Sequence, residues 1–257
     1  MSIYRIWSIA ANGFREVIRD RILYFIGFFA LLMLIAVRLL PEISVGTHQK
    51  IFLDLGLGAI SLLGAIVAIF VGTGLINKEI EKRTVLILIP KPLSRAEFII
   101  GKHLGLSAVL GVMLTCMTLV YLLLLSWTKV NYQALPLIIA VVFLILELAL
   151  LIAVAIAFGV FTSSILATLL SFGIYCMGHI SKDLLKLGAI SKNESIASIT
   201  QTLYLLLPDL ERFNLRNDAV YGLLPNVDTL LSNATYGILY TALLLGISIL
   251  IFSRRQF

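Results

Sequence analysis

Residues 130–181 read VNYQALPLIIAVVFLILELALLIAVAIAFGVFTSSILATLLSFGIYCMGHIS, and Glu147 is the one charged side chain in this stretch. A helix of about 20 apolar residues crosses the ~30 Å hydrocarbon core of a bilayer. The stretch is far too long for a single crossing, so it predicts two antiparallel membrane helices, residues 135–161 and 165–180. Thr162-Ser163-Ser164 supplies the turn between them. The stretch therefore indicates an integral membrane protein.

The composition of the whole chain agrees with this class. The protein has 257 residues, of which 60% are hydrophobic and 13% are charged. Soluble domains are about 45–50% apolar and about 25% charged. The 20 basic and 14 acidic side chains are too few to cover a soluble domain of this size. Disorder is also excluded, because it requires low hydrophobicity.

Four further stretches are apolar and long enough to cross a bilayer, and they are residues 23–40, 55–76, 104–127 and 234–252. With the central pair they make six predicted spans. We therefore expect an all-α, polytopic membrane protein with one transmembrane domain over residues 1–257.

The distribution of basic residues predicts the orientation of the chain. Six spans place both termini on one side, and twelve of the 20 basic residues fall on that side: Arg5, Arg15, Arg19, Arg21, Lys78, Lys82, Arg83, Lys91, Arg95, Lys102, Arg254 and Arg255. The short loops on the other side hold Arg38, Lys50 and Lys129. Because basic loops stay in the cytoplasm, we expect cytoplasmic termini in the plasma (inner) membrane. The net charge of +6 thus reads as an orientation signal, and no nucleic acid is expected as a partner.

Residues 1–21 precede the first span and show an amphipathic pattern. Apolar side chains such as Trp7 and Phe14 recur at helical spacing, while arginines recur on another face. An arginine face opposite a Trp/Phe/Ile face is typical of a helix in the headgroup plane. We expect an interfacial helix here; a cytoplasmic helix packed on a partner is the alternative.

Residues 77–102 join the second and third spans on the cytoplasmic side. The charged run that starts at Lys78 continues the second span as a helix, and Pro90 and Pro92 then forbid a continuous helix. Ser94-Arg95-Ala96-Glu97 matches a capping box, which predicts a new helix start. We expect a helix, a proline corner and a short helix that leads into the third span. A basic loop that only fixes the orientation of the chain would not need two helices broken by prolines. We therefore expect a docking element.

Residues 181–233 are expected outside the membrane. The run 195–207 is apolar and uncharged but too short to cross, so it predicts a helix on or dipping into the outer leaflet.

The chain lacks the sequence motifs of a nucleotide or metal site. It contains no GxxxxGK[ST] motif, so it cannot bind ATP through a P-loop. It also contains no HExxH, no GxSxG and no CxxC, and its three histidines are far apart in sequence. Gly101 and Gly105 form a GxxxG pair, which suits close helix packing.

Glu147 is the unusual residue of the membrane region. A carboxylate at the centre of a span costs about 2.5–3.5 kcal/mol on insertion scales, so Glu147 is expected to face the protein interior or a wet cavity, or to be protonated. It is either a pathway or coupling residue, or an interhelical contact with a hydroxyl such as that of Thr73, Thr115 or Ser171.

The loop between spans two and three resembles that of type-2 ABC transporter permeases, the membrane subunits of exporters whose ATPase is a separate chain. The resemblance rests on Glu79-Ile80-Glu81-Lys82-Arg83-Thr84, on Lys91-Pro92-Leu93-Ser94-Arg95-Ala96-Glu97-Phe98 and on Gly101-Lys102. Arg15-Glu16 and Arg19-Asp20-Arg21 before the first span, the six-span layout and the Arg254-Arg255 end support it. It covers nearly the whole chain.

The resemblance implies a permease that forms a homodimer or heterodimer on two ATP-binding subunits, which bind ATP and Mg²⁺; no cofactor is implied in this chain. Residues 79–101 would then supply the coupling helix and residues 3–20 the elbow helix. The hypothesis is that Glu81, Arg83, Arg95 and Glu97 contact the ATPase. The apolar spans suit a lipid-like or amphipathic cargo. The competing readings are a membrane scaffold without transport and a proton-coupled transporter that uses Glu147.

Overall fold

The computed structural model describes residues 3–20, 22–43, 48–81, 94–191 and 193–254. Within these residues the chain is helical and contains no strand. The elements are α1 (Ile3–Asp20), α2 (Ile22–Ile43), α3 (His48–Glu81), α5 (Arg95–Trp127), α6 (Ala134–Phe161), α7 (Ser164–Ile190), α8 (Glu194–Leu206), η1 (Leu210–Phe213), α9 (Arg216–Tyr221) and α10 (Val227–Arg254).

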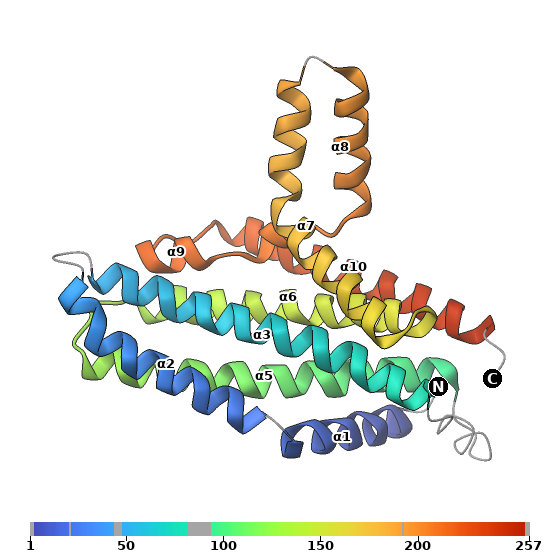
Figure 1. The fold of residues 1–257 in the computed structure, drawn as a ribbon, viewed down its shortest axis with the longest axis horizontal. Helices are drawn as coiled ribbons and strands as arrows, with labels where there is room; N and C mark the ends of the chain where they lie inside the picture. Colours follow the sequence, from blue (N-terminus) through green and yellow to red (C-terminus); the bar gives the residue numbers. More distant parts are fainter. Residues whose placement is uncertain (1–2, 21, 44–47, 82–93, 192, 255–257) are drawn as a thin grey trace.

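Six of the described helices are long and apolar enough to cross a membrane, namely α2, α3, α5, α6, α7 and α10. They correspond one for one to the six predicted spans, so the prediction of an all-α protein with six spans is confirmed. α2, α3, α5, α6 and α10 run side by side, and both termini lie at the same end of the bundle (Figure 1).

The observed helices differ from the predicted spans mainly at their ends. α3 begins at His48, seven residues before the predicted span, and α7 continues ten residues past the predicted end at Ile180. The expected short helix before span three is also not separate, since α5 runs unbroken from Arg95 to Trp127. Hydropathy locates the apolar part of a helix, but polar turns at either end extend it at no cost where they meet water.

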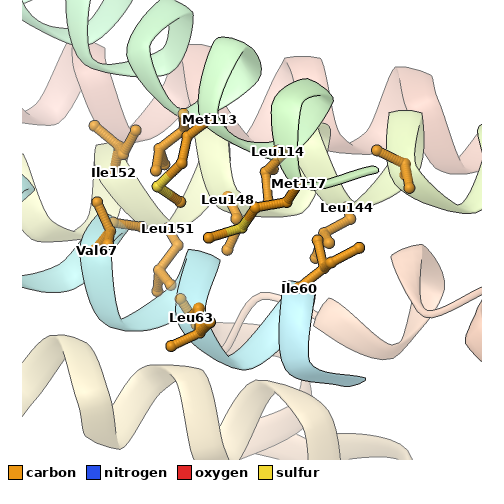
Figure 2. Packing of buried hydrophobic residues seen from close by; sticks show 14 of the residues in the cluster. Ile60, Leu63, Val67, Met113, Leu114, Met117, Leu144, Leu148, Leu151 and Ile152 are labelled. Atoms are coloured by element: carbon orange, nitrogen blue, oxygen red, sulfur yellow. The ribbon is translucent and has the colours of Figure 1, made fainter. Parts of the chain in front are cut away.

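The core lies where α3, α5 and α6 meet. Figure 2 shows Ile60, Leu63 and Val67 of α3 facing Met113, Leu114 and Met117 of α5, with Leu144, Leu148, Leu151 and Ile152 of α6 beside them. Gly64 allows this approach, because a Cβ there would lie 2.6 Å from a methyl carbon of Leu148. α6 packs against α3, α5 and α10, so most of its residues are buried. This explains why it is the most continuously apolar of the six spans.

Small residues allow the spans to approach closely at several points. A Cβ on Gly72 of α3 would lie 2.8 Å from the Cβ of Ala155 of α6. Gly56 leaves space for the ring of Tyr121, whose hydroxyl donates to the carbonyl of Leu53 at 2.9 Å. Small residues therefore permit close packing of the spans at these contacts.

The C-terminal part of α7 and α8 form a hairpin that points away from the bundle (Figure 1). The predicted helix 195–207 is present as α8, and it pairs with α7 where Gly188 faces Thr200. At the base of the hairpin, the buried Asp209 carboxylate binds Arg212 at 3.0 Å and Lys182 at 3.5 Å. The Tyr236 hydroxyl accepts a hydrogen bond from the backbone N–H of Asp209. These contacts hold the segment after α8 against α7 and α10.

Candidate functional site

The first turn of α5 is held by the predicted capping box. The backbone N–H of Glu97 donates to the Ser94 hydroxyl at 3.2 Å, and the Glu97 carboxylate accepts from the backbone N–H of Ser94 at 3.0 Å. Two amides at the helix start are thereby satisfied. Glu97 is only 2% exposed, so it serves the helix start rather than the protein surface.

Arg95 ties the start of α5 to the end of α10. Its Nη1 donates to the carbonyl of Phe252 at 2.8 Å and also to that of Ser253. The last carbonyls of a helix lack intrahelical partners and carry partial negative charge, so a guanidinium stabilises them. Phe98 stacks on Phe252 with ring centroids 5.7 Å apart and reinforces the same junction. Arg95 thus joins two helices that are far apart in sequence.

α1 packs across the first turns of α5, where the two predicted glycines allow the contact. A Cβ on Gly101 would lie 2.8 Å from Ile9, and a Cβ on Gly105 would lie 2.6 Å from the carbonyl oxygen of Ala10. Arg5 of α1 lies 4.0 Å from the Glu97 carboxylate. The helix expected over residues 3–20 is present, and one of its faces packs on α5.

Other side chains of α1 remain at the surface. Ile3, Tyr4 and Trp7 are strongly exposed, as are Arg15 and Glu16. Exposed aromatic and arginine side chains on one short helix suit the boundary between lipid and water, so the interfacial placement stays a prediction that the geometry favours.

Several predicted docking residues cannot be placed. Arg83, Thr84 and Pro92 lie outside the described residues. Glu79 and Glu81 lie on the last turn of α3, and Arg19 and Asp20 on the last turn of α1, but these four side chains are likewise outside the described part of the chain. Lys102, which the resemblance assigns to the docking loop, is buried with its ammonium 6.0 Å from the ring centre of Phe98.

Glu147 lies inside the protein, as expected, at 2% exposure. Its nearest ionisable neighbour is His179 of α7, whose Nε2 is 3.4 Å from Oε1. This contact is not a hydrogen bond, and Oε1 has no hydrogen-bond partner in the described structure. The hydroxyl partners suggested for Glu147 are wrong. The Thr73 hydroxyl hydrogen-bonds to the carbonyl of Ile69 and to the Thr168 hydroxyl, and the Thr115 hydroxyl donates to the carbonyl of Gly111 in its own helix. The Ser171 hydroxyl makes no hydrogen bond in the described structure.

A cavity of about 150 Å³ borders Glu147. Residues of α3, α6, α7 and the segment 213–216 line it. Arg216 lines it on one side, and its guanidinium donates two hydrogen bonds to the Asp54 carboxylate, at 2.6 and 2.7 Å. Ser61, Tyr175, His179 and Asn214 contribute further polar groups.

The sequence reasoning missed His179, although a signal existed. Glu147 lies 15 residues before Thr162, and His179 lies 16 residues after Ser163. In an antiparallel hairpin, residues equally far from the turn lie at the same depth, so the two could have been paired. Their helical faces still had to match, and sequence spacing does not fix the rotation of two helices about their axes.

The fold and these sites define a multi-pass α-helical membrane protein with a structured contact zone at the end that holds its termini. A family model described as "ABC-2 family transporter protein" matches residues 7–257, so the chain belongs to the ABC-2 transporter family. A comparison with curated proteins finds no match. The family consists of membrane transport subunits, in agreement with the resemblance of the loop sequence.

Proposed function

We propose that the protein is the permease subunit of an ATP-driven exporter in the plasma membrane, with ATP and Mg²⁺ bound by a separate nucleotide-binding subunit. The observation that carries the proposal is the family match over residues 7–257. The absence of a P-loop motif from this sequence supports a division of labour between two chains.

The ATPase is proposed to dock on the cytoplasmic loop 77–102. Charged residues of this loop, Glu79, Glu81 and Arg83, are the proposed contacts. The structure changes the role proposed for Glu97, which caps α5 from a buried position. Its proposed contribution is therefore to hold the start of α5 in a defined orientation.

Movement of the loop can be transmitted to α5, α1 and α10 together. Arg95 links the start of α5 to α10, and Gly101 and Gly105 allow α1 to pack closely on the first turns of α5. A displacement of the α5 start by the ATPase would thus carry α1 and α10 with it. Coupling requires that the ATPase binds the two permease conformations with different affinity.

The permease is proposed to work as a homodimer or heterodimer, with both termini in the cytoplasm and α1 in the headgroup plane. α2, α7 and α10 present most of their apolar side chains to the outside of the monomer. These helices are available to lipid and to a second permease chain.

The proposal is tested by co-purification and transport. The permease should capture an ABC ATPase from its own cells, and Arg83→Glu should weaken that capture while Lys129→Glu, in the loop between α5 and α6, leaves it intact. Vesicles containing the complex should move a lipid-like cargo only with ATP. Capture without any ATP dependence would instead support a membrane scaffold.

Arg95→Glu separates docking from transmission. A carboxylate at the C-terminal carbonyls of α10 repels them, so the link between α5 and α10 should break. We expect ATP hydrolysis to continue and transport to fall about tenfold or more, the loss equivalent to about 1.4 kcal/mol of coupling. If capture and transport both survive, the assignment of Arg95 to coupling is wrong.

A further inference from the structure

The cavity beside Glu147 contains two groups that both accept hydrogen bonds and face each other. Nδ1 of His179 is 3.0 Å from the carbonyl oxygen of Tyr175. A carbonyl only accepts, so this bond assigns the hydrogen of a neutral imidazole to Nδ1. Nε2 then presents a lone pair towards Oε1 of Glu147, 3.4 Å away. A proton on either group, or a donor from outside that lies beside the pair, satisfies two such acceptors at this distance.

The charge of the cavity favours a cation as that donor. The Arg216 guanidinium is paired with the Asp54 carboxylate through two short bonds, so the positive charge at the cavity wall is already balanced. The Glu147 carboxylate is left facing the cavity with a buried oxygen that has no hydrogen-bond partner in the described structure. A buried carboxylate is stable when it is paired.

The shape of the cavity suits a small organic group. A cavity of about 150 Å³ is large enough for a molecule the size of benzene. Tyr175 and Phe213 line it with aromatic rings, which attract cations through their faces. The side chain of His179 is 25% exposed, so this member of the pair is reachable from outside the protein core.

We propose that this cavity binds a protonated primary amine, whose N–H groups donate to both the Glu147 carboxylate and Nε2 of His179. A primary ammonium has enough donors for both acceptors, whereas a quaternary ammonium has none. The amine can belong to a soluble ligand or to the headgroup of a lipid such as phosphatidylethanolamine. Amine binding stands on the cavity alone, while its role as cargo recognition rests on the proposed transport function.

Calorimetric titration of the full-length permease, in nanodiscs of phosphatidylcholine, tests the site directly. Butylammonium should bind saturably at one site per chain. Tetramethylammonium and butanol, which are similar in size, should bind about ten- to hundred-fold more weakly, because the first lacks N–H donors and the second lacks charge. Equal binding of all three ligands, or no saturable binding of butylammonium, would overturn the proposal.

Variants assign the acceptors. Glu147→Gln should weaken butylammonium binding about ten- to hundred-fold, and His179→Phe should weaken it less, because the carboxylate remains. Glu42→Gln, at an exposed position on α2, is the matched control and should bind like the wild type. Size-exclusion profiles identify any variant that fails to fold. Wild-type affinity in folded Glu147→Gln would refute the site.

A second titration in nanodiscs that contain phosphatidylethanolamine distinguishes the sources of the amine. A loss of apparent butylammonium affinity in these discs would identify the lipid headgroup as a competitor for the site. Unchanged affinity would support a soluble amine as the ligand. Because neither titration contains an ATPase, a failure of binding is distinguishable from a failure of the proposed export function, which capture and vesicle transport test.

Discussion

At the scale of single residues, close backbone approaches decide how α1 meets the bundle. Gly105 faces the backbone of Ala10, and the distance leaves no space for a methyl group. Gly111, six residues further along the same helix, has open space where a Cβ would lie. Gly105 is thus required for the close approach of α1, whereas Gly111 is not, and substitution of each by alanine can measure the difference.

Gly105→Ala should destabilise the protein, because the new methyl would lie 2.6 Å from the Ala10 carbonyl oxygen and α1 must shift. The expected cost is about 1–3 kcal/mol. Thermal unfolding in detergent should show a lower Tm. Gly111→Ala is the matched control and should keep the wild-type Tm or raise it, because alanine favours a helix over glycine. Equal Tm values for both variants would contradict the packing of α1 on α5.

At the scale of elements, helix starts differ in whether a side chain accepts hydrogen bonds from the backbone N–H groups of the first turn. Ser94 caps α5 through its hydroxyl, whereas the hydroxyl of Ser163, at the same position before α7, makes no capping hydrogen bond. The sequence pattern distinguishes them as well, since a glutamate stands three residues after Ser94 and a leucine three residues after Ser163.

Ser94→Ala should therefore loosen the first turn of α5 by about 0.5–2 kcal/mol, because an amide at the helix start loses its acceptor. Hydrogen exchange of residues 95–98 should accelerate accordingly. Ser163→Ala should leave exchange at the start of α7 nearly unchanged, and Ser94→Thr should restore protection in α5. Acceleration of equal size in both alanine variants would show that the side-chain cap is not responsible.

The α7–α8 hairpin depends on a buried carboxylate at its base. Asp209→Asn removes the charge that holds Lys182 and Arg212, and we expect a loss of about 1–3 kcal/mol in local stability. Limited proteolysis near residues 190–194 should become faster. Asp183→Asn is the control, because Asp183 and its partner Lys186 are exposed and such pairs contribute little. Unchanged cleavage of Asp209→Asn would contradict a fastening role for Asp209.

At the scale of the whole molecule, the end that holds both termini is the proposed docking end for an ATPase. The start of α5, α1 and the end of α10 meet there through Arg95 and Gly101. If this end faces the cytoplasm, all the contacts that could transmit movement from an ATPase lie in one zone. The orientation is thus the property on which the proposed function depends most.

Thiol labelling tests the orientation in a chain with Cys116 and Cys176 replaced by serine. We expect a membrane-impermeant reagent to label Asn131→Cys from outside intact cells and to leave Asn12→Cys and Ser253→Cys unlabelled. Inside-out vesicles should show the reverse. All three positions are exposed, so burial does not limit the reaction. Labelling of Ser253→Cys from outside would reverse the predicted topology.

The sequence by itself determined the helical class, the six spans and the capped start of α5. Hydrophobic length and the hydrogen bonds of a capping box are local properties, so a short stretch of sequence is sufficient to specify each of them. The family resemblance of the loop was also readable from local residues, and the match over residues 7–257 confirms it.

The tertiary structure alone decided which distant side chains meet. His179 lies beside Glu147, and Arg216 pairs with Asp54, 162 residues away. Arg95 reaches the carbonyls of Phe252 and Ser253. Apolar spans are alike on every face, so their sequence specifies neither which helices are neighbours nor how each is rotated. Close packing at particular glycines helps to fix both. The cavity and the α5–α10 junction, on which the proposed activities depend, exist only in the folded arrangement.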